Sequence, residues 1–422
     1  MPYRVAAIDI HKKVLMVVVA TGADEVKDAT GEALEFECRR FGAGQAEREH
    51  VVAWLRERKV MEVVMESTAQ YWKPVWLDLE PHFGKLHLAQ AQSNRAPKGR
   101  KNDYKDAKRL ARRLLAGELM LSFVPEPEQR GWRTLTRSKH QLVRDRVQLQ
   151  NQLESLLEEM RIKLSGVISD LLGASGRRIL AALAQGETDP VKLADLGDQR
   201  LKCSQEQLVD ALRSTPTPLQ LEVLKLFLER LGVLDSQIEA LDRLMAKELK
   251  KHEEAVTRLA KAPGFGVDSA QQIIAEIGVE ASAFPSADHF GSWFGGCPGS
   301  NMSAEENHSS RSPKGNRFVR RILTQAAQGA VRTKNSFFER LFKRFLPKLG
   351  YNGAIWAVAH RLGRLVWKIL HDGVDYIERG AETTPQAKKR RAQKLAQTLR
   401  RLGYTVTITP LDAEPSAELP AP

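Results

Sequence analysis

The order of apolar runs in the first 115 residues limits the fold of this chain more than any other feature. Residues 3–10, 14–21 and 33–41 are predicted as β-strands, because apolar runs with many branched residues are separated there by polar or Gly-containing turns. The further expected elements are helices at 46–59, 71–79 and 103–115 and strands at 62–66 and 86–89. The order β-β-β-α-β-α-β-α predicts an α/β domain with a mixed sheet flanked by helices.

Four acidic residues stand at the ends of these elements. Asp9 ends the first strand, Glu66 ends the fourth, and Asp103 and Asp106 open a helix with i, i+3 spacing. Carboxylates at strand ends gather at one sheet edge, and residues three apart share a helical face. Carboxylates that meet without a counter-charge repel one another, and Mg²⁺ prefers oxygen ligands. We therefore predict that the four acids hold a pair of Mg²⁺ ions suited to phosphodiester chemistry. An N-cap role for Asp103 and a surface position for Glu66 are the alternatives.

The middle of the chain carries two long heptad-like patterns. Leucines recur every seven residues from Leu135 to Leu156, and a similar three-four spacing runs from Leu224 to Met245. Such seams predict an antiparallel coiled-coil arm or a dimerisation element, and an ordinary intramolecular bundle is the alternative. Residues 165–218, which lie between the two patterns, are expected to form a small helical cap.

Positive charge is concentrated near the C-terminus. Of 65 Lys and Arg and 52 Asp and Glu in the chain, 22 basic but only five acidic residues lie between Arg311 and Tyr404, so the remainder is slightly acidic. A second basic island spans residues 95–113. Clustered cations predict contact with nucleic acid, and a solvated helix face is the alternative. The predicted nucleic-acid contacts are Lys101, Lys105, Arg311, Lys314, Arg317, Arg320 and Arg321.

A Gly-rich turn and a Ser-rich loop precede the last basic helices. The turn Gly264–Gly266, followed by an apolar helix, is similar to a helix-hairpin-helix element, whose backbone N–H groups bind phosphate, although it could also simply mark a helix boundary. The loop from Gly295 to Asn316 contains five serines beside several cations. Hydroxyls near fixed positive charge suit attack on a phosphate, and an ordinary polar loop is the alternative.

Composition excludes several protein classes. Three widely spaced cysteines give neither a disulfide framework nor the spacing of a Cys-rich zinc site. No apolar run approaches the ~18–20 residues of a membrane span, and the start of the chain is not a signal peptide. We expect a soluble, cytoplasmic, nucleoid-associated protein without a membrane partner, and a disordered acidic end after Thr405.

The chain resembles the DEDD-type insertion-sequence transposases of the IS110 class from about Tyr3 to about His371. The stretches that carry the resemblance are AIDIHKK, MESTAQYWKPVW, GRKNDYKDAKRLARRL, APGFGVDSAQQIIAEIG and FGGCPGSNMSAEENHSSRSPKGNRFVRRIL. The resemblance implies four parts: a RuvC-like (RNase H-like) domain at 1–125, a coiled-coil arm with a small helical cap at 126–258, a mainly helical transposase domain at 259–375, and a basic helix with an acidic tail at 376–422.

The resemblance also implies the chemistry of a DNA transposase or recombinase. It assigns the acidic tetrad to Asp9, Glu66, Asp103 and Asp106, and the nucleophile that forms a phosphoserine link to DNA to Ser303. It further implies a noncoding guide RNA that pairs with donor and target DNA, and a homodimer or homotetramer with active sites shared between protomers.

The chain departs from the usual family pattern beside both sets of catalytic residues. Ala69 and Asn102 stand where relatives usually have Gly and Thr, and Glu305 and Glu306 stand where relatives usually have Gly and a basic run. Three alternatives stay open: a site-specific DNA invertase of the same family, a non-catalytic nucleic-acid-binding relative, and a metal-dependent junction nuclease that uses only the acids.

Overall fold

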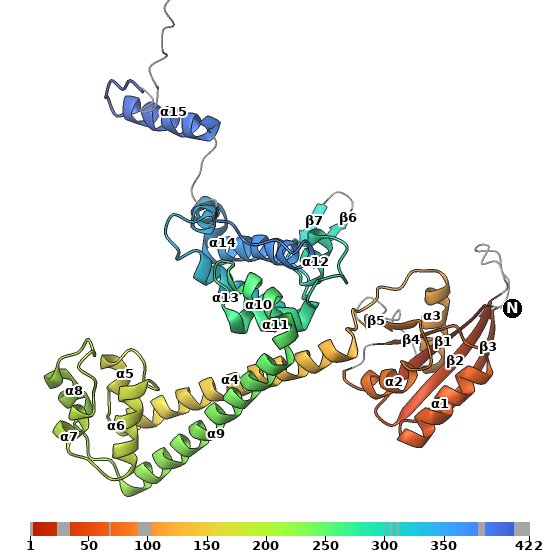
Figure 1. Cartoon of the computed structure of the whole chain (residues 1–422), viewed down its shortest axis with the longest axis horizontal. Helices are drawn as coiled ribbons and strands as arrows, with labels where there is room; N and C mark the ends of the chain where they lie inside the picture. The colour runs from red at the N-terminus through yellow and green to blue at the C-terminus, as the bar shows by residue number, and fades with distance from the viewer. Residues whose placement is uncertain are drawn as a thin grey trace, which may run out of the picture. The chain divides into compact units, whose positions relative to one another are not determined.

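The computed structural model describes residues 3–22, 34–66, 69–91, 103–299, 301–303, 306–309, 312–378 and 385–408. Two compact units divide the chain, Met1–Pro125 and Glu126–Pro422 (Figure 1). Lys101, Arg311 and the acidic end from residue 409 lie outside the described residues. Within the described ranges, no helix has both the length and the apolar character needed to cross a membrane.

The N-terminal unit contains a five-stranded sheet with the strand order β3-β2-β1-β4-β5. Its elements are β1 (Tyr3–Ile10), β2 (Val14–Gly22), β3 (Glu35–Gly42), α1 (Gln45–Glu57), β4 (Glu62–Glu66), α2 (Trp72–Leu79), β5 (Leu86–Ala89) and α3 (Asp103–Leu115). β2 pairs antiparallel with both β1 and β3, whereas β4 pairs parallel with β1 and β5. The predicted mixed sheet with flanking helices is therefore confirmed.

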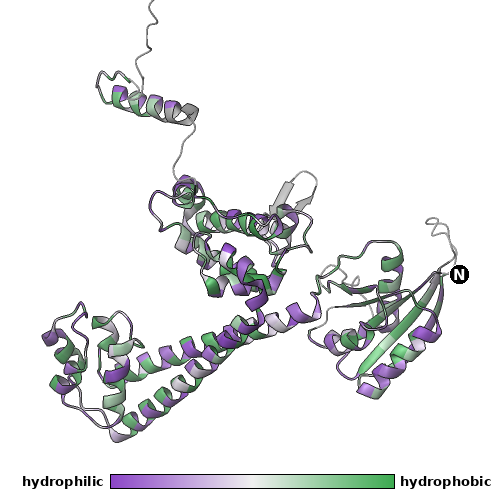
Figure 2. Cartoon of the chain, viewed as in Figure 1, coloured by the Kyte–Doolittle hydropathy of each residue, from purple (hydrophilic) through white to green (hydrophobic). Residues whose placement is uncertain are grey.

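The two faces of this sheet pack against different helices, because side chains alternate along a strand. Ile8 and Met65 belong to a buried cluster that includes residues of α1 and α2. Ala7 and Val64, one position earlier on the same strands, join the cluster that includes Leu110 of α3. The central strands β1, β2 and β4 are accordingly hydrophobic along most of their length (Figure 2). Helix α3 thus covers the face on which odd-numbered residues of β1 and even-numbered residues of β4 lie.

The C-terminal unit is mainly helical. Its elements are α4 (Pro127–Glu159), α5 (Leu164–Val167), α6 (Ala174–Ala184), α7 (Pro190–Asp195), α8 (Gln205–Leu212), α9 (Pro218–Glu248), a 3₁₀ turn (Lys250–His252), α10 (Glu253–Ala260), α11 (Val267–Ile277), α12 (Ala287–Trp293), β6 (Asn301–Ser303), β7 (Glu306–Ser309), α13 (Arg317–Ala330), α14 (Phe337–His371) and α15 (Pro385–Arg401).

Helices α4 and α9 lie side by side and run antiparallel (Figure 1). Their ion pairs show the direction, since Lys139 of α4 pairs with Asp242 of α9, and Arg146, farther along α4, pairs with Asp235, earlier on α9. Leu149 of the predicted heptad seam is 2% exposed and belongs to one hydrophobic core with α9 and the short helices α5–α8. The seam of α4 is therefore covered from within the same chain.

A close backbone contact joins the turn before α11 to helix α13. Gly264 has a φ of +79°, and a Cβ on this residue would lie 1.9 Å from the carbonyl oxygen of Ala326. Both the left-handed conformation and the close approach require glycine here. Helix α14, which packs on α12 and α13, is interrupted at Gly350, where φ is 66°.

Candidate active site

Strand register brings two of the predicted acids to one end of the sheet. Ile8 of β1 pairs with Met65 of β4 in a parallel ladder, so Asp9 and Glu66 are the next residues on the two neighbouring strands. By the alternation of side chains, both belong to the face that α3 covers. Asp9 is 16% exposed in its side chain, so it is largely removed from solvent.

The other two acids lie in the first turn of α3, which packs across β1 and β2. The Asp103 side chain is 39% exposed, and that of Asp106 is 23% exposed. Asp106 lies 3.4 Å from the guanidinium of Arg109, one turn farther along the helix. After β4, α2 and β5, the chain thus forms α3 on the same face of the sheet as the Asp9 side chain.

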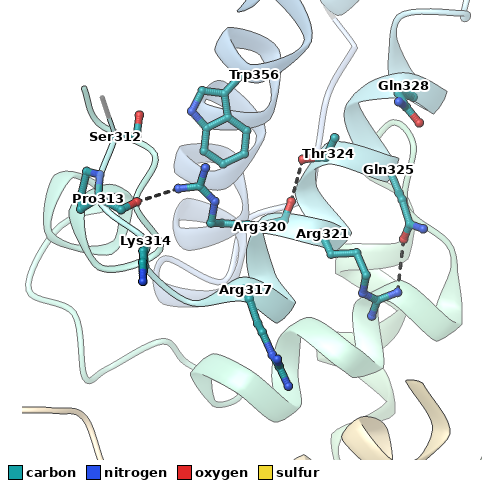
Figure 3. A pocket seen from close by; sticks show the side chains of 11 residues that line it. Ser312, Pro313, Lys314, Arg317, Arg320, Arg321, Thr324, Gln325, Gln328 and Trp356 are labelled. Atoms are coloured by element: carbon teal, nitrogen blue, oxygen red, sulfur yellow. Dashed lines mark hydrogen bonds between the residues drawn. The ribbon is translucent and has the colours of Figure 1, made fainter. Parts of the chain in front are cut away.

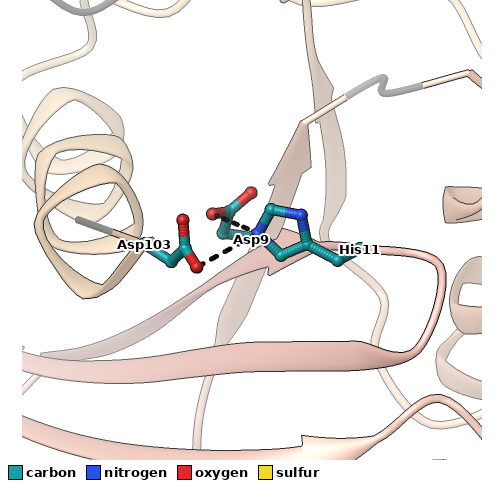
Figure 4. Close-up of side chains that lie close together, drawn as sticks. All are labelled: Asp9, His11 and Asp103. Atoms are coloured by element: carbon teal, nitrogen blue, oxygen red, sulfur yellow. Dashed lines mark ion pairs between the residues drawn. The ribbon is translucent and has the colours of Figure 1, made fainter. Parts of the chain in front are cut away.

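A histidine that was not predicted as a site residue joins the acids. His11 Nε2 lies 3.2 Å from a carboxylate oxygen of Asp9 and 3.6 Å from one of Asp103, so that this one nitrogen faces both carboxylates (Figure 4). One ligand atom from each of these three residues lies within 4.8 Å of the others. The sequence signal was the stretch AIDIHKK, in which the histidine follows Asp9 by two residues, but single histidines are common in proteins.

The donor set of this cluster fits a divalent cation. Two carboxylates provide hard oxygen ligands, and an imidazole nitrogen is a ligand for many first-row divalent metals. Glu66 and Asp106 are not members of the three-residue group, although they lie on the same face of the sheet, the former by strand register and the latter on α3. The structure therefore brings Asp9 and Asp103 together directly.

The predicted nucleophile lies in a short hairpin of the C-terminal unit. Ser303 is the last residue of β6 and pairs with Glu306, the first residue of β7. The side chains of this hairpin, and Ser300 and Ser310 beside it, lie outside the described part of the chain. The backbone thus places Ser303 at the end of β6, opposite Glu306 of β7.

A cavity of about 830 Å³ opens at the start of α13, shortly after this hairpin (Figure 3). Four of the predicted nucleic-acid contacts line it, together with Trp356 of α14; these four are Lys314, Arg317, Arg320 and Arg321. No acidic side chain is among the described residues that line it. This cationic cavity is suited to an anion.

The four cations of the cationic cavity differ in their surroundings. Arg320 donates to the carbonyl oxygens of Gly295 and Pro313, at 2.8 and 2.9 Å, and its guanidinium lies 4.3 Å from the centre of the Trp356 ring. Burial lowers the pKa of this guanidinium below its usual range. Arg320 therefore also ties the loop after α12 to α13 and α14.

Arg321 is likewise partly engaged, since it donates to the side chain of Gln272 at 2.5 Å, and burial lowers its pKa. Lys314 and Arg317 are exposed and have no ion-pair partner among the described residues. Lys105 is exposed on α3 in the N-terminal unit. Lys314 and Arg317 are consequently the cations of the cavity most available to a ligand.

A buried carboxylate connects the arm helix α4 to the start of α13. Glu276 of α11 has a 2% exposed side chain and accepts two hydrogen bonds from Arg137 of α4, each 2.8 Å long. Arg133 of α4 lies 3.5 Å from the same carboxylate, and Asn316 donates to it at 2.9 Å. Asn316 is the N-cap of α13, with its side-chain oxygen accepting from two backbone N–H groups. The sequence signal was an acid within the apolar run IIAEI, which is costly to bury unpaired.

Two family models match the chain on both sides of the arm. One, the transposase model of the DEDD type of IS110 elements, matches residues 6–162, and another, described as "Transposase IS116/IS110/IS902 family", matches residues 256–342. The chain belongs to the IS110 class of transposases. The predicted resemblance is thereby confirmed.

Two curated relatives resemble this transposase over most of its length. The protein named "Probable family 20 transposase" of Pseudomonas aeruginosa is 24% identical over 346 residues, which cover 79% of this chain and 89% of the relative. The "Putative transposase y4pF/y4sB" of Sinorhizobium fredii is 25% identical over 314 residues, which cover 71% of each chain. Membership in this class implies a DNA substrate and an enzyme that cuts and rejoins DNA in transposition.

Family membership also bears on the acidic cluster of this transposase. A divalent metal is typical of DEDD nuclease-like domains, and the cluster of Asp9, His11 and Asp103 lies inside the matched range. Ala69, at a position usually Gly in the class, has a φ of 48°, which is the left-handed region that favours glycine. Ala69 thus has a backbone conformation that favours glycine, although it carries a Cβ.

Proposed function

We propose that this transposase cuts and rejoins the DNA of its own insertion sequence through a covalent phosphoserine at Ser303, assisted by Mg²⁺ at the acidic tetrad. The observation that carries the proposal is the common face of Asp9, Glu66, Asp103 and Asp106, on which Asp9 and Asp103 lie close enough to share one ligand with His11. Carboxylates gathered in this way favour a divalent cation. The family match to both parts of the chain adds support.

The chemistry needs no co-reactant. The Ser303 hydroxyl oxygen attacks the scissile phosphorus, the bond from phosphorus to one DNA oxygen breaks, and the serine proton ends on that leaving oxygen. Rejoining reverses the step, since a DNA hydroxyl attacks the phosphoserine and the serine hydroxyl is restored. The phosphodiester energy is conserved throughout. Mg²⁺, when bound, polarises the phosphate oxygens.

Roles for the protein's own cations follow from their surroundings. Lys314 and Arg317 contact the DNA backbone, and Arg320 and Arg321 add positive potential from their half-buried positions. Arg311, Lys101 and Lys105 extend the contact to the flanking strand. The turn at Gly264–Gly266 acts as a helix-hairpin-helix element that binds a backbone phosphate at the start of α11.

The remaining assignments rest on family membership. In this proposal, residues 1–125 form the RuvC-like domain, 126–258 a coiled-coil arm with its cap, 259–375 the transposase domain, and 376–422 a basic helix with an acidic tail. A noncoding guide RNA selects the donor and target DNA, and a homodimer or homotetramer shares composite active sites. The protein acts in the cytoplasm on the nucleoid.

The decisive experiment identifies the residue that carries the DNA. The full-length protein is incubated with Mg²⁺, its element ends and the RNA that copurifies with it, and the covalent adduct is digested with nuclease and analysed by mass spectrometry. We expect a nucleotide on Ser303, loss of the adduct in Ser303→Ala, and its retention in the control Ser300→Ala.

Nucleic-acid binding should persist in Ser303→Ala, because one neutral hydroxyl contributes little to backbone affinity. A nucleotide attached to another serine would overturn the assignment of Ser303. Cleavage by the wild-type protein without any covalent adduct would favour a metal-dependent nuclease that uses only the acids.

A further inference from the structure

A second hollow, of about 510 Å³, lies along helix α14 and shares no lining residue with the cationic cavity. Residues from the start of α14, from its second half and from the segment that follows the helix line it together. We call it the aromatic pocket, and the residues used below are Phe337, Phe338, Arg361, Trp367, Lys368 and Tyr376. The interruption of α14 at Gly350 allows the two halves of the helix to face one hollow.

The aromatic walls of this pocket are held in place by their neighbours. Phe338 is buried and stacks on Tyr376, with centroids 6.5 Å apart and planes 26° from parallel. Phe337 meets Phe338 edge to face, at 5.2 Å. The Tyr376 hydroxyl donates to one carboxylate oxygen of Glu378 at 2.5 Å, and the other oxygen accepts from the Phe337 backbone N–H at 3.1 Å. The rings are therefore fixed before any ligand arrives.

Part of the aromatic surface is open to the pocket. Phe337, Trp367 and Tyr376 are all half-buried. The indole N–H of Trp367 donates to the Phe284 carbonyl at 2.9 Å, which turns the polar edge of the ring into the protein. One face of the indole stacks on His371, with ring centroids 4.2 Å apart. The remaining ring surface of Trp367 that lines the pocket is apolar, and a flat ligand that contacts it gains stacking energy.

The rim of the pocket is positively charged. Arg361 and Lys368, seven residues apart on one face of α14, are exposed and have no ion-pair partner in the described part of the chain. Arg364 between them pairs with Asp288. The one acidic residue among the described lining is Asp372, which accepts from His371. Two available cations thus stand beside fixed aromatic walls.

Aromatic walls with a cationic rim match one class of ligand. A nucleobase stacks on aromatic side chains and its phosphate pairs with Lys and Arg, and the volume falls in the ~300–1,000 Å³ range of small-ligand sites. A paired base is excluded, because a duplex hides both faces of each base within its stack. We propose that the aromatic pocket binds one unpaired nucleotide of a single-stranded nucleic acid, with the base at Phe337 and Trp367 and the phosphate at Arg361 and Lys368.

This site goes beyond the proposed cleavage chemistry and does not depend on it. The test therefore uses full-length protein in the Ser303→Ala background, so that a failure of the serine assignment leaves the readout unchanged. A 12-nucleotide strand is made both as RNA and as DNA, with one 4-thiouridine or 4-thiothymidine, and a blunt duplex of the same sequence serves as the paired control. Binding is measured by fluorescence anisotropy, and crosslinks are mapped by mass spectrometry after irradiation.

We expect crosslinks at Phe337, Trp367 or Tyr376. Phe337→Leu, which keeps an apolar side chain but removes the ring, should weaken single-strand binding about fivefold or more, since one stacked base contributes ~1–3 kcal/mol and 1.4 kcal/mol is a factor of ten. Duplex binding should change less than about twofold, because phosphate contacts dominate it. Tyr351→Leu removes an exposed ring of α14 outside the pocket and should leave both affinities unchanged.

A surface variant keeps the proposal testable if Phe337→Leu does not fold. Arg361→Gln with Lys368→Gln should lower the slope of log K against log[salt] for the single strand by about 0.7, the value for one neutralised phosphate. Lys348→Gln, an exposed α14 lysine outside the pocket, is the matched control.

The outcomes answer two separate questions: whether the pocket binds a nucleotide, and whether that nucleotide belongs to RNA or to DNA. Tighter pocket-dependent binding of the RNA strand assigns the pocket to RNA, and tighter binding of the DNA strand assigns it to melted DNA. Crosslinks that map elsewhere, or single-strand binding that neither pocket variant weakens, would overturn the proposal. Equal losses for single strand and duplex would also overturn it, because they would show only general electrostatic attraction.

Discussion

Replacing Glu276 with alanine removes the carboxylate that holds α4, α11 and the N-cap of α13 together. The carboxylate is 2% exposed and is contacted by Arg137, Arg133 and Asn316. Arg137 is 37% exposed and can turn its guanidinium toward water, whereas Arg133 is 12% exposed and cannot. The variant therefore removes a carboxylate from beside a largely buried guanidinium, which keeps its hydrogen bonds to the backbone carbonyls of residues 275 and 276.

The expected loss of stability follows from this difference. Removing one partner of a buried ion pair costs about 3–5 kcal/mol, and the partial exposure of Arg137 favours the lower end. At ~2–4 °C per kcal/mol for a domain of 150–250 residues, Tm should fall by about 6–12 °C. Glu276→Gln keeps an acceptor but not the charge, so its Tm should lie between those of the alanine variant and the wild type.

The dependence on pH gives a second measure of the same interaction. Burial raises the pKa of Glu276, but Arg137, Arg133 and Asn316 lower it more, so the pKa lies below its ordinary value of 4.5. A lowered pKa means that the carboxylate stabilises the fold fully above about pH 4.5, and that this contribution is lost as the pH falls through the folded-state pKa. The Tm deficit of Glu276→Gln should therefore shrink on acidification from pH 7 to below pH 4.

The assay is thermal unfolding followed by circular dichroism at a series of pH values, with Glu239→Ala as the control. Glu239 forms an exposed i, i+4 pair with Arg243, and its removal should leave Tm unchanged within error. A Tm for Glu276→Ala that matches the wild type would refute this account of the carboxylate. So would a deficit of Glu276→Gln that stays constant between pH 7 and pH 3.

Three further predictions test other parts of the molecule. Asp9→Asn should abolish metal-dependent strand cleavage while the circular dichroism spectrum is kept, and full activity would contradict the acidic metal site. Gly264→Ala should lower Tm strongly because its Cβ would meet backbone, whereas Gly266→Ala, whose Cβ would have no neighbour within 4 Å, should not; equal effects would be inconsistent with the close contact to α13. Lys314→Gln with Arg317→Gln should reduce the salt slope for duplex DNA by about 1.8, at ~0.9 per phosphate; an unchanged slope would place the backbone contacts elsewhere.

The strands could be predicted because their signal is local. The expected strands 3–10 and 14–21 match Tyr3–Ile10 and Val14–Gly22 closely, since branched residues favour extended backbone whatever surrounds them. The third strand begins two residues later than expected, at Glu35. Its residues are mostly exposed, so the contrast between apolar and polar positions that marks a strand boundary is weak there.

The relative placement of candidate site residues could be predicted where the order of strands and helices alone brings them together. Strand ends of a parallel pair meet at one edge, so Asp9 and Glu66 could be placed side by side from the order of the elements. His11 could not, because its place depends on the rotamer of one side chain and on where the first turn of α3 reaches the sheet. A single histidine after a strand carries no spacing that indicates this contact.

The partners of Glu276 and the aromatic pocket could likewise not be predicted from the sequence. The partners of Glu276 come from α4, nearly 140 positions earlier, and from the cap of α13, 40 positions later. The pocket forms because α14 is interrupted at Gly350, although its residues read as a helix on either side. Neither the ion pairs of Glu276 nor the pocket produces a repeating pattern of residues in the sequence.

The sequence by itself determined the strand and helix periods, the basic C-terminal segment and the transposase family, because backbone preference, hydrophobic repeat and charge are properties of neighbouring residues. Only the tertiary structure decided that His11 meets Asp9 and Asp103, that Glu276 binds arginines of the arm, and that aromatic rings of α14 share a hollow with exposed cations. The physical reason is that polar and aromatic groups find partners across surfaces brought together by burial of the core, and a one-residue shift of a strand or helix would exchange those partners for others.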